Sequence, residues 1–294
     1  MARPSLMKGC LGTAFAGAAL ILAATTFVYI QAQRIPRGRP DYVALGSSFA
    51  AGAGLGPLQT DGPLLCARSI NGYPQQLARM RKLSIVDMSC GGAVTRHLLR
   101  GGQFFQGPQI RAIARDTTLV TITVGGNDTY YIADLSQLAA RNSTSLWGRL
   151  VRQFWGGPKH LEDRDFAGFR RNLTALIRTI HRRAPSARIV VVTYPAILPP
   201  AGTCRRLGVS SAEAAQMRRV GDELAASTVA AARKAGALTV DMHKLGAKNH
   251  ACSPQPWTRG WTNGGVAPFH PTRLGAEATA RATSAALKRL PAAR

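Results

Sequence analysis

The sequence predicts an α/β fold in which a five-stranded parallel sheet is covered by helices on both faces. Five short runs rich in β-branched residues alternate with longer amphipathic runs, the order that crossover connections between parallel strands require. Glycine and small polar residues follow several of the short runs directly, as happens where a buried strand ends. The chain has 294 residues, so one domain is expected once an apolar N-terminal segment is set aside.

The expected strands are the short apolar runs, and the amphipathic runs between them are the expected helices. The strands are predicted at 41–45, 83–88, 118–124, 187–193 and 237–241. The helices are predicted at 73–80, 107–113, 166–184, 211–235 and 272–290.

The N-terminal 35 residues are typical of an export segment. Arg3 and Lys8 precede an apolar run over 9–30, which is long enough to span a bilayer. No clean A-x-A motif precedes Gln33, so an uncleaved signal anchor is favoured over a cleaved signal peptide. A basic, proline-rich linker at 36–40 then leads to a single domain over 41–294.

Four cysteines follow the export segment, apart from Cys10 at its start. An even number in an exported chain indicates two disulfides. Three pairings exist, and proximity in the sequence favours Cys66 with Cys90 and Cys204 with Cys252. A zinc site is not expected, because the sequence has no C-x-x-C motif and no tight Cys/His cluster. No metal or cofactor is expected.

The formal net charge is +24, from 38 Lys and Arg against 14 Asp and Glu. Such an excess predicts an anionic neighbour. Nucleic acid is not expected, because the arginines are scattered and no nucleic-acid-binding module is present. Anionic lipid head groups or an acidic cell envelope suit an exported chain better, and we expect a monomer.

Chemically useful residues follow the first three strands, where ligands bind in such sheets. Ser48 follows the first strand, Gly92 follows the second, and Asn127 follows the third. A hydroxyl on a sharp turn, an unobstructed glycine N–H and an asparagine amide are groups that acyl transfer requires. Each feature taken alone is also explained by a turn or a helix cap.

One of the six histidines has a position that suits a general base. His270 lies in the loop before the last helix, with a proline one residue after it and another two before it. From that loop its imidazole can reach the end of the first strand, although a structural role is the alternative. The remaining histidines are interpreted as solvated: His97, His160, His181, His243 and His250.

These blocks, in this order, resemble the SGNH hydrolases or GDSL lipases/esterases, and particularly their secreted actinobacterial branch with disulfides. The resemblance covers about 41–290 and implies a flavodoxin-like three-layer sandwich. It also implies that Ser48 is the nucleophile and His270 its base. The oxyanion hole would comprise the backbone N–H groups of Ser48 and Gly92 and the side chain of Asn127.

The chain departs from the family pattern at two positions. Ser47 replaces the usual aspartate of the first block, and Ala267 replaces the aspartate three residues before His270. The resemblance therefore implies a Ser-His dyad in which a backbone carbonyl of residues 265–267 accepts the Nδ1–H of His270. The carboxylates that would contradict this by contacting His270 are Asp61, Asp128 and Asp241.

An insertion is expected at about 135–165. Within it, residues 145–155 repeat apolar side chains at helical spacing, with Arg149 and Arg152 opposite. A helix packed on the core is the first interpretation, and a lid or an interfacial helix with a hinge at 156–158 is the second.

The sequence thus predicts a serine esterase acting on acyl or lipid esters outside the cytoplasmic membrane. Two alternatives are an envelope carbohydrate O-deacetylase of the same fold and a non-catalytic, basic envelope-binding protein.

Overall fold

The computed structural model describes residues 5–34, 38, 40–261 and 267–289. Its core is one parallel five-stranded sheet of order β2-β1-β3-β4-β5, so the predicted fold class is confirmed. Tyr42 at the start of β1 is in register with Ile85 on one side and Leu119 on the other. The strands are β1 (Tyr42–Gly46), β2 (Ile85–Asp87), β3 (Leu119–Thr123), β4 (Arg188–Val192) and β5 (Leu238–Val240).

Four of the expected helices are present within two residues of their predicted ends. They are α3 (Tyr73–Arg81), α7 (Phe166–Arg183), α8 (Ser211–Lys234) and α10 (Arg273–Lys288). The other α-helices are α1 (Ser5–Gln33), α2 (Ser48–Ala51), α4 (Thr95–Arg100), α5 (Tyr131–Arg141), α6 (Leu146–Phe154) and α9 (Met242–Leu245). Three of the four 3-10 helices in the described part of the chain are η1 (Leu64–Cys66), η2 (Gln103–Phe105) and η4 (Arg205–Leu207).

The helix expected at 107–113 is a single 3-10 turn, η3 (Gln109–Ala112). Pro108 and Ile113 flank it with ψ angles of 140° and 116°, which are not helical, so the turn cannot propagate in either direction. The Gln109 side chain instead holds the backbone of Gly46, accepting from its N–H at 2.8 Å and donating to its carbonyl at 3.0 Å. A contact with β1, and not helix propensity, therefore fixes this segment.

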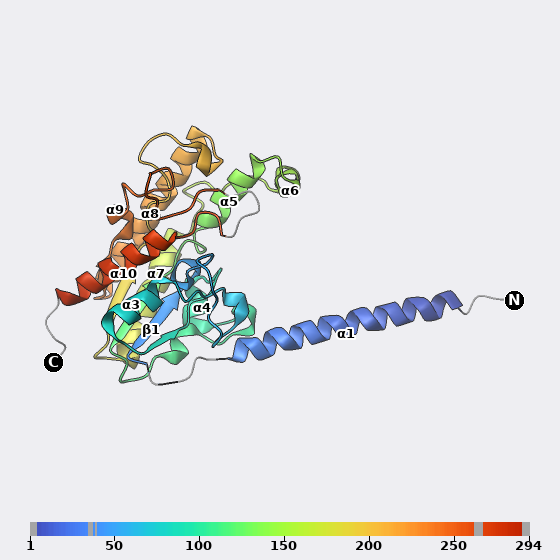
Figure 1. Cartoon of the computed structure of the whole chain (residues 1–294), viewed down its shortest axis with the longest axis horizontal. Helices are drawn as coiled ribbons and strands as arrows, with labels where there is room; N and C mark the ends of the chain where they lie inside the picture. Colours follow the sequence, from blue (N-terminus) through green and yellow to red (C-terminus); the bar gives the residue numbers. More distant parts are fainter. Residues whose placement is uncertain (1–4, 35–37, 39, 262–266, 290–294) are drawn as a thin grey trace.

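The two faces of the sheet are covered by different helices, as Figure 1 shows. Alternate β1 residues divide between them, because successive strand side chains point to opposite faces. Val43 and Leu45 belong to one buried cluster, which includes residues of α4, α5, α7 and α8. Tyr42 and Ala44 belong to the other, with residues of α3 and α10. This three-layer arrangement holds the carboxyl ends of the strands at one edge.

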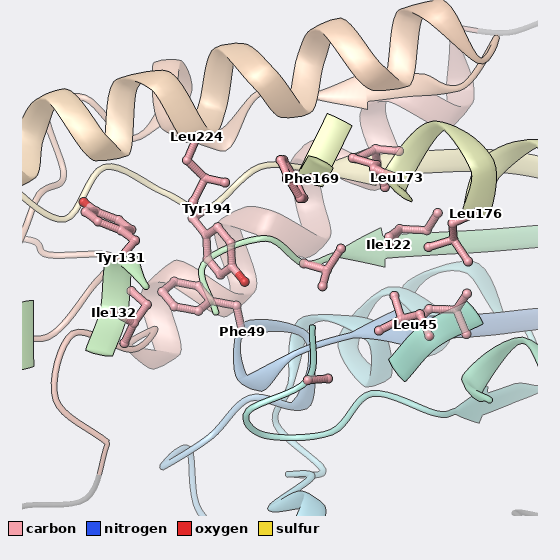
Figure 2. Packing of buried hydrophobic residues seen from close by; sticks show 14 of the residues in the cluster. Leu45, Phe49, Ile122, Tyr131, Ile132, Phe169, Leu173, Leu176, Tyr194 and Leu224 are labelled. Carbon is pink, nitrogen blue, oxygen red and sulfur yellow. The ribbon is translucent and has the colours of Figure 1, made fainter. Parts of the chain in front are cut away.

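The larger cluster reaches from the sheet centre to the strand ends (Figure 2). Leu173 and Leu176 of α7 are fully buried near Leu45 and Ile122. In the first turn of α7, Phe169 packs against Gly125, where an added Cβ would lie 2.6 Å from the ring. Gly125 has a φ of 122°, so neither the space nor the backbone admits a side chain there. The turn after β3 is thus fixed by the core.

Candidate active site

The turn after β1 carries the two serines. Gly46 ends β1 with a φ of 148°, and a Cβ there would lie 2.3 Å from the carbonyl oxygen of Thr123. Glycine is required by this close approach of β1 and β3. Ser47 follows as the N-cap residue of α2, and its N–H donates to the same Thr123 oxygen at 2.9 Å. Ser48 then starts α2 at the carboxyl edge of the sheet.

Ser48 and His270 are brought together from positions 222 residues apart. The Oγ of Ser48 lies 2.7 Å from Nε2 of His270. The Nδ1 atom of the same ring lies 2.7 Å from the carbonyl oxygen of Pro268. A carbonyl only accepts hydrogen bonds, so Nδ1 carries the proton and the Nε2 lone pair faces the Ser48 hydroxyl. This is the arrangement of a nucleophile with its base.

The loop that carries His270 is fixed on both sides of the histidine. Phe269 is fully buried with a φ of 60°, and its ring stacks on Trp261. The carbonyl of His270 accepts from the N–H of Arg259 at 2.8 Å. Thr272 caps α10 by accepting from the N–H of Gly275 at 3.1 Å. The imidazole is therefore positioned by packing and by backbone hydrogen bonds.

The acceptor for Nδ1 was expected among residues 265–267, and it is the carbonyl of Pro268 instead. Residues 265 and 266 lie outside the described part of the chain. Ala267 and Phe269, on either side of Pro268, have left-handed backbones with φ of 54° and 60°. In this conformation of the loop the Pro268 carbonyl points at the His270 ring. The kind of acceptor agrees with the expectation, and only its position differs by one residue.

The three carboxylates that would contradict a dyad have other partners. Asp128 accepts from the N–H and hydroxyl of Thr95. Asp241 caps α9 by accepting from the N–H of Lys244, and its carboxylate also accepts from Thr193. Burial lowers the pKa of the Arg68 guanidinium, and the negative charge of Asp61 is one of two that oppose this shift, so Asp61 interacts with Arg68. None of these three carboxylates forms a hydrogen bond with His270 in the described part of the chain.

Two effects favour the neutral form of His270. Burial lowers the pKa of its imidazole below the ordinary value of 6.5, and the positive charge of Arg259 lowers it further. The hydrogen bond to the Pro268 carbonyl opposes this shift in pKa without cancelling it. A neutral imidazole is the form that accepts a proton from serine.

Gly92 and Asn127 lie beside Ser48 at the ends of the neighbouring strands, β2 and β3. Gly92 has a φ of 79° and is exposed. One N–H of the Asn127 amide donates to the carbonyl of Ala93 at 2.9 Å, which orients the side chain and leaves the second N–H available. Within the described residues, the backbone N–H groups of Ser48 and Gly92 donate to no protein acceptor. All three donors can therefore serve an oxyanion.

The loop that carries Gly92 is held by the disulfide between Cys66 and Cys90. The Gly91 N–H donates to the carbonyl of Cys66 at 2.9 Å, and Gln103 donates to the carbonyl of Gly91 at 2.6 Å. Cys204 and Cys252 form the second disulfide, so both bridges have the predicted pairing. No group of three or more His, Cys, Asp or Glu residues suitable for a metal occurs among the residues described.

Sequence reasoning missed two residues that support the site. Tyr194 is the partner of Ser47 in the first block: its hydroxyl lies 2.7 Å from Oγ of Ser47 and accepts from the N–H of Gly126 at 3.2 Å. Tyr194 lies two residues after the end of β4, and this position beyond a strand end is the sequence feature that could have identified it as part of the site. Gln109, which holds Gly46, gives no signal in the sequence.

The other histidines lie outside this site, and at least one is not simply solvated. His243 pairs with Asp222 at 2.8 Å beside a separate cavity of about 390 Å³. Nδ1 of His97 accepts from the N–H of Val94 at the start of α4. The structure therefore brings only His270 to Ser48.

Sequence and fold comparisons agree with this geometry. The model of the GDSL-like lipase/acylhydrolase family matches residues 44–278. Lipase 1 of Streptomyces coelicolor is 30% identical over 266 residues, which cover 88% of this chain and 89% of the relative.

Two solved structures share the fold over nearly their whole length. The extracellular lipase of Streptomyces rimosus has a TM-score of 0.64 at 27% identity, with 83% of this chain and 97% of that chain covered. Phospholipase A1 of Streptomyces albidoflavus has a TM-score of 0.65 at 25% identity, with 84% of this chain and 98% of that chain covered. Because the family model spans most of the sequence, the chain belongs to the GDSL-like lipase/acylhydrolase family and is a carboxylic ester hydrolase.

Proposed function

We propose that the chain hydrolyses acyl esters of lipids through a Ser48–His270 dyad. The observation that carries the proposal is the 2.7 Å contact between Ser48 Oγ and the unprotonated Nε2 of His270. In the first step Nε2 takes the hydroxyl proton while Oγ attacks the ester carbonyl carbon. The bond that forms is an acyl-serine ester, and the protonated imidazole returns its proton to the departing alcohol. Water, activated by the same imidazole, then releases the carboxylic acid.

The negative charge that develops on the carbonyl oxygen has three proposed donors. They are the backbone N–H groups of Ser48 and Gly92 and the free N–H of the Asn127 amide. These donors follow three adjacent strands, β2, β1 and β3, whose carboxyl ends lie at the same edge of the sheet. The Pro268 carbonyl stabilises the imidazolium less than a carboxylate would, since it carries only a partial charge.

Lipid esters are the proposed substrate class because the relatives with matching length carry the names lipase and phospholipase A1. The apolar N-terminal helix and the two disulfides indicate export. We further propose that α1 remains as a membrane anchor, that 41–294 forms the catalytic domain, and that the enzyme works as a monomer at an anionic envelope surface, without nucleic acid. Of the proposed linker 36–40, only residues 38 and 40 are described.

The test is hydrolysis by the full chain over a series of p-nitrophenyl esters of rising chain length, beside an acetylated glycan. We expect long or medium acyl esters to be preferred and the glycan to release no acetate. Ser48→Ala should abolish turnover of every ester, with Ser47→Ala as the matched control that retains most of it. Acetate release from the glycan in preference to acyl esters would instead support a carbohydrate deacetylase.

A further inference from the structure

Four large apolar side chains are exposed beside the point where α1 meets the α/β domain. Leu64 and Leu65 belong to η1 and are 47% and 49% exposed, and Phe104 and Phe105 belong to η2 and are 41% and 57% exposed. The two turns touch, because Gln106 after η2 donates to the sulfur of Cys66 at 3.2 Å. We name this set of four residues the apolar tip. An exposed apolar set of this size indicates a binding surface.

The apolar tip contacts the end of α1 directly. The rings of Phe105 and Tyr29 are 6.4 Å apart, and Gln33 donates to the carbonyl of Phe105 at 3.3 Å. The segment Ala16–Gln33 is long and apolar enough to cross a membrane, and only 11% of it is buried in the protein. If α1 crosses a bilayer, the apolar tip therefore lies at the surface of that bilayer.

The backbone of the apolar tip is costly to form and gains little within the protein. Phe104 and Phe105 have φ angles of 47° and 62°, a region that bulky residues rarely adopt. Backbone strain of this kind concentrates at functional sites. Burial of the two phenylalanine rings in a lipid phase would offset it.

A second set of exposed apolar side chains lies on α6. Four large side chains of α6 are exposed, and Arg149 and Arg152 lie between them in the sequence. The exposed fractions are 71% for Leu146, 59% for Trp147, 41% for Leu150 and 75% for Phe154. The expected packing on the core is therefore made by Gly148 and Val151, which are buried, and by Trp155, and not by these four side chains. In Figure 1, α6 lies on the side of the domain toward which α1 projects.

We propose that the apolar tip and α6 together form a docking face for an anionic phospholipid bilayer, the same bilayer that α1 enters. The apolar side chains enter the head-group region, and the exposed Arg149 of α6 binds a lipid phosphate, whereas Arg152 already donates to the carbonyls of Arg141 and Ser143. The inference rests on the proposed function and adds where the substrate comes from. Gln103, which precedes Phe104 in η2, donates to the carbonyl of Gly91, next to Gly92, so the apolar tip lies close to the loop that carries Gly92. Docking therefore presents the active site to acyl esters within the bilayer.

The position of the apolar tip can be tested without any activity. The full chain with Ser48→Ala is placed in anionic nanodiscs whose lipid tails carry bromine, which quenches nearby tryptophan. Phe105→Trp adds one fluorophore at the tip, and Leu245→Trp adds a matched one on α9, where Leu245 is 55% exposed. We expect the added fluorescence to be quenched for Phe105→Trp and not for Leu245→Trp. Equal fluorescence of the two in brominated and plain lipid would overturn the proposal.

The functional consequence is tested with an active chain. Phe104→Asn/Phe105→Asn removes both rings with a residue that tolerates the left-handed backbone. We expect hydrolysis of a bilayer-embedded phospholipid to fall about tenfold or more, the equivalent of 1.4 kcal/mol of lost surface binding, while a soluble short-chain ester is hydrolysed within about twofold of the parent rate. The control, Met80→Gln/Leu245→Gln, removes exposed side chains from α3 and α9 and should change neither rate.

The outcomes separate this inference from the proposed function. Unchanged hydrolysis of the bilayer substrate by Phe104→Asn/Phe105→Asn would overturn the docking face. An equal loss on both substrates would also overturn it, because the rings would then support only the Gly92 loop. Quenching of Phe105→Trp, together with a parent chain that keeps Ser48 and yet hydrolyses no ester, would leave the docking face intact and refute the proposed esterase mechanism alone.

Discussion

Ala267→Asp restores the carboxylate that the family pattern places three residues before the histidine, and it tests what orients His270. Ala267 has a φ of 54°, a conformation that aspartate tolerates better than most residues, so the substitution should not strain the backbone. In the parent chain the Nδ1–H of His270 already donates to the Pro268 carbonyl at 2.7 Å. The new carboxylate must therefore displace an existing acceptor.

The size of the effect follows from the two acceptors. A neutral hydrogen bond contributes about 0.5–1.5 kcal/mol net, and one to a charged group about 1.5–3 kcal/mol. Exchanging the Pro268 carbonyl for a carboxylate thus offers at most about 2.5 kcal/mol, or about seventyfold in rate. Because the carbonyl bond is lost in the exchange, we expect kcat/KM to change by only a few-fold.

The assay is kcat/KM on p-nitrophenyl butyrate against pH, with Ala267→Asn as the uncharged control of the same shape. A carboxylate in contact with the imidazole would raise the pKa of His270 and move the acidic limb of the profile to higher pH. A rise in kcat/KM of about a hundredfold or more for Ala267→Asp, without a similar rise for Ala267→Asn, would refute the reasoning. It would mean that the Pro268 carbonyl does not orient His270 in the parent chain.

Three further results are expected. Asn127→Ala should remove about 3 kcal/mol of transition-state stabilisation, the contribution of one oxyanion donor, and the loss should appear in kcat. A change in KM alone would argue against that role. Activity should fall as pH decreases through the pKa of His270, which burial and Arg259 hold below 6.5, because the neutral imidazole is the base; an acidic limb above 6.5 would contradict this. The double substitution Cys66→Ala/Cys90→Ala removes a disulfide between residues 24 positions apart and should lower the free energy of unfolding, measured by urea titration, by about 3 kcal/mol. Free thiols at these two cysteines in the exported parent protein would refute the bridge.

Much of the fold was predictable because its signals are local. Each strand lies in a short, largely apolar run, and α7 and α8 repeat apolar residues at helical spacing, so their positions were found within two residues. The 3-10 turn η3 was not, because the contact of Gln109 with Gly46 spans 63 residues. Helix α5 was missed for a different reason: its apolar face begins directly after the Asn127 block and was taken as insertion.

The candidate site was predictable in its chemistry and less so in its support. Ser48, Gly92 and Asn127 follow strand ends, and parallel strands bring their carboxyl ends to one edge. The direction of a carbonyl depends on backbone angles that sequence does not give, which is why the Nδ1 acceptor was placed one residue early. Tyr194 was missed because its partner Ser47 lies 147 residues away.

The central claim is that Ser48 is the nucleophile and His270 its base. The most direct measurement is peptide mass mapping of the full chain after reaction with a fluorophosphonate, which phosphonylates a serine only when it is activated by a base. The account predicts one adduct on Ser48, absent from Ser48→Ala and strongly slowed in His270→Ala, with Ser47 unmodified. An adduct on Ser47, or undiminished labelling of Ser48→Ala, would contradict it.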